Sequence, residues 1–164
     1  MWSRDHKMMK ILLATDGSKF SLAAARRCCE LIDFKKETAV RIISVIEKFS
    51  PIEPFGTSDD YYILVQKAAR GAAEKIVADT KLTMLKTLGE AKVDIQTEAI
   101  SGSPNETLIE EAEKWEADLI IVGSQGRGFW GRMLLGSVSN AIVRHAPCSV
   151  LVVRLNKDEE LKTE

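Results

Sequence analysis

Glycine and serine are dense in one stretch of this 164-residue chain, GSQGRGFWGRMLLGSVSN at residues 123–140. Five glycines fall within its first fourteen positions, after a short apolar run and before a segment with helical spacing. Glycine lets a backbone approach a ligand closely and adopt a positive φ. Backbone N–H groups at a loop-to-helix junction attract anions, and the helix dipole adds to that attraction. The stretch therefore predicts a site for a phosphate ester, although a surface loop without a ligand would have the same spacing.

Polar and charged side chains near this stretch would complete such a site. Ser137 and Ser139 lie at the predicted helix start, where their hydroxyl groups can donate to a phosphate. Arg127 and Arg132 would add positive charge from the loop, unless they only form part of a solvated surface. Asp16 follows another apolar run, and a carboxylate at a strand end can accept hydrogen bonds from ribose hydroxyls.

Two common phosphate-binding motifs do not fit the stretch. No Gly-Lys-Ser or Gly-Lys-Thr follows the glycines, which excludes a Walker A loop. The residues Gly126, Gly128 and Gly131 have the bare spacing of a dinucleotide-binding fingerprint, but no helix begins inside it. The spacing alone is weak support for either class of site.

Strand and helix patterns alternate along the chain and would position these groups. Strands are predicted at 9–15, 39–46, 93–100, 118–123 and 149–155. Helices are predicted at 18–34 and 60–88, from Ser103 through Trp115, and at 136–145. The polar alternation of 93–100 favours a sheet edge, whereas the continuous apolar run 118–123 is typical of a central parallel strand. This order predicts an α/β fold with a mainly parallel sheet, which binds ligands at the carboxyl ends of its strands where the strand order reverses.

One helix start has a clear capping pattern. Ser103 is expected to be the N-cap, Pro104 suits the first helical position, and Glu106 can close a capping box. The segment 47–60, with two prolines and a glycine, is expected to be a loop.

Composition limits the class of protein. The length predicts one domain over 1–164, with a core at about 8–155 and a charged, solvated tail at 156–164. The net charge of −1 argues against a general nucleic-acid binder, and no apolar run is long enough to span a membrane. The N-terminal segment lacks the apolar stretch of a signal peptide, so we expect a cytoplasmic protein.

The cysteines and histidines do not suggest a metal site or a disulfide framework. Cys28 and Cys29 are adjacent and Cys148 is distant, so buried thiols are expected, with a redox role as the alternative. Only two histidines are present, and His145 is expected to have a structural role near a helix end.

Several segments together resemble one family. The spacing Gly-x-x-Gly, nine residues, Gly-Ser, which begins at Gly123, resembles the ATP-binding signature of universal stress proteins. The segment KILLATDGS is similar to the family's first strand and Asp turn, and GSP at 102–104 to the turn before its third helix. The segment GSVSNAIVRHAPCSVLVVR is similar to its fourth helix and fifth strand. The resemblance covers about residues 8–155.

The resemblance implies a fold and a nucleotide site. The fold would be a single open parallel five-stranded sheet in the order 3-2-1-4-5 with helices on both faces, similar to adenine-nucleotide alpha hydrolases. Asp16 would contact the ribose, and the backbone of Val45 would meet adenine. The implied nucleotide-binding residues are Ala14, Thr15, Asp16, Val45, Val122, Gly123, Gly126, Gly136, Ser137, Val138 and Ser139. For Val45 and Val122 the alternative is a place in the core, and for Asp16 and Ser137 it is a helix cap or a turn.

The chain also departs from the family pattern. Gln125 stands where the family often has His or Ala, and the loop carries Phe129, Trp130 and Gly131. Trp130 would cover the nucleotide, pack at a dimer contact or join the core. The loop 47–60 has no clear counterpart and would shape the adenine side.

The resemblance further implies an ATP-binding, homodimeric regulatory module of the stress response. Its ligand would be ATP, with AMP or ADP as alternatives, and Mg²⁺ would bind with ATP near Asp16. The dimer would form through the strand 149–155, whose apolar edge needs covering, and the alternative is a monomer whose own tail covers that edge. We expect no enzymatic activity beyond slow ATP hydrolysis. The alternatives are a slow ATP hydrolase or phosphate-transfer enzyme, and a structural dimer that binds no nucleotide.

Overall fold

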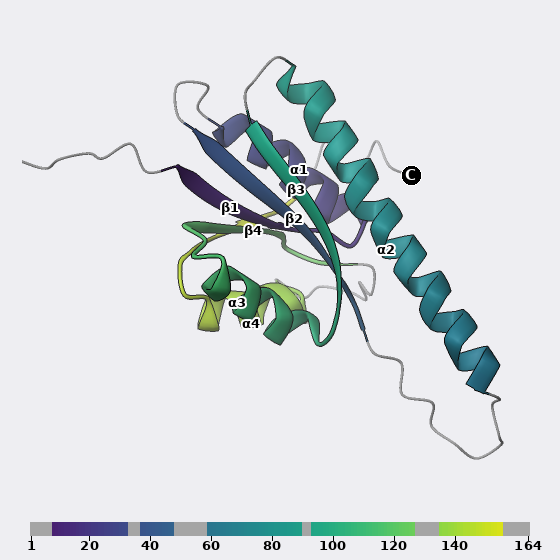
Figure 1. Ribbon diagram of the computed structural model, residues 1–164. Helices are drawn as coiled ribbons and strands as arrows, with labels where there is room; N and C mark the ends of the chain where they lie inside the picture. Colours follow the sequence, from purple (N-terminus) through teal and green to yellow (C-terminus); the bar gives the residue numbers. More distant parts are fainter. Residues whose placement is uncertain (1–7, 33–36, 48–58, 90–92, 127–134, 156–164) are drawn as a thin grey trace, which may run out of the picture.

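The computed structural model describes residues 8–32, 37–47, 59–89, 93–126 and 135–155. Strands and helices alternate strictly along these residues (Figure 1). The elements are β1 (Met9–Ala14), α1 (Lys19–Leu31), β2 (Thr38–Ile46), α2 (Asp59–Leu88), β3 (Val93–Ser101), α3 (Pro104–Lys114), β4 (Leu119–Gly123), α4 (Ser137–His145) and β5 (Ser149–Val153). The predicted alternation is confirmed, with ends that differ by a few residues.

The five strands form one sheet in the order β3-β2-β1-β4-β5, and every neighbouring pair is parallel. The order implied by the resemblance is therefore confirmed. The polar-alternating strand β3 lies at one edge, as its pattern predicts, and β5 lies at the other. β1 lies in the middle, so the strand order reverses between β1 and β4, where such sheets bind ligands.

Helices cover both faces of the sheet and enclose two apolar clusters (Figure 1). The side chains of β1 alternate between the clusters: Ile11 and Leu13 point to one, and Leu12 and Ala14 to the other. The first cluster includes residues of α1 and α2, and the second includes residues of α3 and α4. The two faces are thus separate layers, and the site residues lie where both layers end.

Three local predictions need adjustment. The helix predicted to reach residue 34 ends at Leu31, because Ile32 has an extended backbone. The last strand ends at Val153 instead of 155. Ser103 is the N-cap of α3 and Pro104 follows it, but the Ser103 side chain makes no capping hydrogen bond, so the predicted capping box is not formed.

Burial governs the chemistry of the cysteines. Cys28 and Cys29 are buried on α1, as the helical spacing predicts for Cys28. Burial, with a smaller contribution from the neighbouring Cys29, raises the pKa of the Cys28 thiol to about 12. A thiol with so high a pKa is a poor nucleophile, which weighs against the redox alternative.

In the part of the chain that the structure describes, no helix has the length and apolarity needed to cross a bilayer.

Candidate functional site

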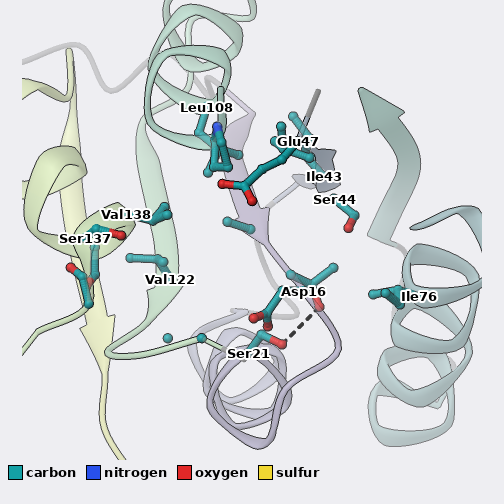
Figure 2. A pocket seen from close by; sticks show the side chains of 18 of the residues that line it. Asp16, Ser21, Ile43, Ser44, Glu47, Ile76, Leu108, Val122, Ser137 and Val138 are labelled. Atoms are coloured by element: carbon teal, nitrogen blue, oxygen red, sulfur yellow. Dashed lines mark hydrogen bonds between the residues drawn. The ribbon is translucent and has the colours of Figure 1, made fainter. Parts of the chain in front are cut away.

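A cavity of about 970 Å³ opens at the carboxyl ends of β1, β2 and β4 (Figure 2). Its volume lies at the upper end of the range for small-molecule sites. The predicted site residues all line it: Ala14, Thr15, Asp16, Val45, Val122, Gly123, Gly126, Gly136, Ser137, Val138 and Ser139. Residues far apart in the sequence thus meet at the point where the strand order reverses, and their contacts with a ligand stay predictions.

A tight turn after β1 holds Asp16 in the cavity. Gly17 has a positive φ of 77°, a conformation that favours glycine. Asp16 Oδ1 accepts a hydrogen bond from the Ser18 N–H at 3.0 Å, and the Ser18 hydroxyl caps α1 by accepting from the Ser21 N–H. Asp16 therefore is a turn residue, as the structural alternative held, and its second carboxylate oxygen is directed toward Gly126.

Gly126 lies close to that carboxylate. A Cβ atom on Gly126 would lie 2.8 Å from Asp16 Oδ2, closer than real Cβ contacts allow. Any side chain at position 126 would therefore displace the Asp16 carboxylate or fill the space beside it. The glycine at this position therefore lets the loop after β4 approach the Asp16 carboxylate closely without displacing it.

The amino terminus of α4 faces the same cavity. Its N-cap is Gly136, which has no side chain that could bond the first helical amides. The Gly136 N–H donates to the Ser124 carbonyl at 2.8 Å, so the loop and the helix are fixed together. The first amides of α4 and the exposed hydroxyl of Ser137 are thus arranged to meet an anion at the cavity wall.

Ser139 is placed differently from Ser137. It is only 2% exposed, and its hydroxyl donates to the carbonyl oxygens of Ser124 and Gly136, each at 3.0 Å. The hydroxyl proton is therefore already engaged within the protein. The predicted phosphate contact of Ser139 would have to come from its backbone amide, while its side chain positions the junction between the loop and α4.

Gly123 has a packing role that the sequence does not reveal. A Cβ atom there would lie 2.7 Å from the backbone carbonyl carbon of Phe20 and 2.9 Å from its oxygen. The end of β4 therefore touches the backbone of α1, which no side chain would permit. Gly123 lines the cavity, but close strand-to-helix packing is sufficient to require it.

The backbone of Val45 faces the cavity. The Thr15 N–H donates to the Ile43 carbonyl at 2.9 Å, and the Gly102 N–H donates to the Ile46 carbonyl at 3.0 Å. Because backbone groups alternate along a parallel strand, those of Val45 point to the same side as those of Ile43, beyond the end of β1. The Val45 side chain packs against the α3–α4 cluster, as the core alternative predicts, and buried Val122 belongs to that cluster.

The sequence interpretation missed one whole wall of the cavity. Residues of α2 line it: Ala69, Ala72, Ala73 and Ile76. Buried Thr80 on the same helix has its hydroxyl 3.4 Å from the Thr15 hydroxyl. The Thr15 hydroxyl donates to the Ser21 hydroxyl at 3.2 Å, and a dashed line at Ser21 marks this bond in Figure 2. The small residues of the segment AARGAA at 68–73 were the available signal that something packs close to this part of α2.

Among the residues that the structure describes, the charged side chains that line the cavity are acidic. Asp16 and Glu47 are the ionisable lining residues there, and neither Lys, Arg nor His appears in the described lining. Arg127, Arg132, Phe129, Trp130, Gly131 and residues 48–58 of the predicted loop 47–60 lie outside the described residues. The tail 156–164 does as well.

Mg²⁺ that binds together with ATP would need a protein side chain as a ligand in the cavity. No group of three or more His, Cys, Asp or Glu side chains forms a metal site among the described residues. Mg²⁺ is usually bound by one or two carboxylates together with substrate phosphates. One carboxylate at Asp16, beside an anion-binding helix terminus, fits that donor set.

Known proteins are similar to this chain over nearly its whole length. The model of the universal stress protein family matches residues 8–154. A universal stress protein of Methanocaldococcus jannaschii is 32% identical over 151 residues, which is 92% of this chain and 84% of that protein.

Solved structures share the fold. A universal stress protein from Lactobacillus plantarum superposes with a TM-score of 0.74 at 24% identity, over 90% of this chain and 99% of that one. A universal stress protein in complex with cAMP has a TM-score of 0.62 at 24% identity, over 88% and 96% of the two chains. An Arabidopsis thaliana member with AMP bound has a TM-score of 0.61 at 19% identity, over 92% and 94%. The family match, the relative and the shared fold agree, and the chain belongs to the universal stress protein family.

Proposed function

We propose that this chain is an ATP-binding regulatory module that acts as a homodimer, with AMP or ADP as alternative resting ligands. One observation carries the proposal. Gly126 has no side chain that would displace the Asp16 carboxylate from the cavity, and the uncapped amino terminus of α4 faces the same cavity. A carboxylate that accepts from ribose hydroxyls and a helix terminus that receives phosphates are the two parts that a nucleotide requires.

Different residues would bind the base, the ribose and the phosphates of the nucleotide. The backbone N–H and C=O of Val45 would bond the adenine edge, and Asp16 would accept from the ribose. The amides of Ser137 to Ser139 and the Ser137 hydroxyl would bind phosphate oxygens, and Mg²⁺ held by Asp16 and the phosphates would reduce the charge of ATP. The structural neighbours with AMP and cAMP support an adenine nucleotide as the ligand class.

A regulatory role is preferred to an enzymatic one on the chemistry of the cavity. Phosphoryl transfer needs a positioned nucleophile and strong charge neutralisation. The described lining offers amides and hydroxyls but no cationic side chain, which favours binding over turnover. Nucleotide occupancy would order the surface around the cavity and so change what a protein partner meets. Slow ATP hydrolysis is the second candidate, and release of phosphate from purified protein would detect it.

The proposed dimer uses the edge strand β5. Its side chains from Val150 to Val153 are only half-buried in the single chain, and one edge of its backbone is not paired within the sheet. Pairing of the β5 edges of two chains would cover both apolar strands. An apolar edge strand that stays unpaired is prone to aggregation.

Calorimetric titration of ATP with Mg²⁺ into nucleotide-stripped protein tests the nucleotide site. Gly126→Val should abolish binding, because the added side chain would displace the Asp16 carboxylate. Gly71→Val is the matched control, since among the described residues a Cβ atom at Gly71 meets nothing within 4 Å and Gly71 is not part of the cavity lining. Absence of binding by the folded wild-type protein would refute the proposal and favour the structural dimer.

A further inference from the structure

We propose that Glu47 reads the base of the bound nucleotide and selects a 6-aminopurine over a 6-oxopurine. This inference rests on the nucleotide site proposed above. Glu47 directly follows β2 and lines the cavity beside Val45. In Figure 2 its side chain extends from the end of β2 into the cavity, with the carboxylate directed toward the middle.

The position of Glu47 follows from the alternation of β2. The side chains of Ile43 and Val45 lie on the α3–α4 face of the sheet, and two residues further along the strand is Glu47. The surrounding lining on this face is apolar, from Leu108, Val122 and Val138. A base stacked among these side chains would place its edge between the backbone of Val45 and the Glu47 carboxylate.

A carboxylate at that edge discriminates by its hydrogen-bonding capacity. An ionised carboxylate accepts hydrogen bonds and donates none. An exocyclic 6-amino group has two N–H donors, so it can donate one to the Val45 carbonyl and the other to Glu47. A 6-oxo group offers only lone pairs, which the carboxylate repels. Hydrogen bonds to charged groups are stronger than neutral ones, but Glu47 is exposed, so we expect the low end of that range, about tenfold in affinity.

The test compares ATP with inosine triphosphate, which differs in carrying a 6-oxo group and a protonated N1. Dissociation constants of both Mg²⁺ complexes would be measured by calorimetry for the wild type, Glu47→Gln and Glu106→Gln. Glutamine offers both an acceptor and a donor, so Glu47→Gln should lower the preference for ATP about tenfold, mainly by tightening inosine triphosphate binding. Glu106 lies on α3 near the cavity without lining it, so Glu106→Gln removes the same charge and should leave the preference unchanged.

The outcomes separate this inference from the proposed function. If the wild type binds ATP and Glu47→Gln keeps the wild-type preference, the nucleotide site stands and the role of Glu47 is wrong. A preference of the wild type for GTP over ATP would also overturn it, because a carboxylate can accept from guanine N1–H and its 2-amino group. If the wild type binds none of these nucleotides, the proposed function itself fails.

Discussion

Gly123, at the end of β4, and Gly126, in the loop that follows, should respond to the same substitution in different ways. At Gly123 an added methyl group would meet the backbone of Phe20 at 2.7 Å, and neither β4 nor α1 can move without disturbing the core between them. At Gly126 the same group would meet, among the described residues, the end of the Asp16 side chain. Gly123→Ala should therefore reduce stability, whereas Gly126→Ala should weaken nucleotide binding and leave stability almost unchanged.

The magnitude follows from the kind of contact. Overpacking of a core costs about 1–3 kcal/mol, and a clash with backbone belongs at the upper end, so Gly123→Ala should cost about 3 kcal/mol. For a chain of this size that loss lowers the melting temperature by about 6–12 °C. Rotation of the Asp16 carboxylate should keep the cost of Gly126→Ala below about 1 kcal/mol. Gly71→Ala, on the open side of α2, should stabilise by about 0.5–1 kcal/mol through helix propensity.

Urea unfolding of the three variants without nucleotide measures these differences, and ATP titration of the folded variants completes the comparison. Unfolding of Gly123→Ala at the wild-type urea midpoint would contradict this prediction, since the close approach to Phe20 would then be relieved without cost. A larger loss of stability in Gly126→Ala than in Gly123→Ala would contradict it as well.

Two further outcomes are expected. In β5 the Val153 carbonyl bonds the Ser124 N–H, so the backbone of Val152 faces away from β4. Val152→Pro should therefore preserve the fold but convert the proposed dimer to a monomer in light scattering after gel filtration, and an unchanged mass would argue against a β5 interface. The pKa of the Cys28 thiol is raised in the folded protein, so its contribution to the free energy of unfolding is fully present below pH 9.0, the ordinary thiol pKa. This contribution is lost as pH rises toward about 12, because the thiol ionises first in the unfolded chain. Wild-type stability should thus fall more steeply than that of Cys28→Val above about pH 9, by about 1.4 kcal/mol per pH unit, and parallel urea profiles would contradict this.

The elements were predictable because each strand has a distinct pattern of burial, whereas the full order of the strands in the sheet was implied by the family resemblance. The polar alternation in β3 identified an edge, and the apolar run 118–123 identified a central strand. Asp16 and the glycines were found because strand ends in a parallel sheet converge on one edge. These signals are local, and a single sequence contains them.

What the sequence could not indicate depends on distances between elements. The contact of Gly123 with the α1 backbone and the hydroxyl pair Thr15 and Thr80 exist only once the layers are packed. The sequence also could not indicate that the Ser139 hydroxyl is engaged, since its hydrogen-bond partners are backbone carbonyls positioned by the loop. A family signature marks positions but does not separate a ligand contact from a packing requirement at the same residue.

The position of β1 in the middle of the sheet also has a consequence for how the chain is made. Its partner on one side, β2, is the next strand, but on the other side Lys10 meets Asp118, which is 108 residues away. During synthesis β1, β2 and β3 can pair early, while the apolar edge of β1 waits for β4 to leave the ribosome. Closing so long a loop is slow, and an open apolar edge invites pairing with other chains. The nascent chain is thus most vulnerable to aggregation until β4 has left the ribosome, after the glycine-rich loop has been translated, and this is when chaperone contact with β1 would matter most.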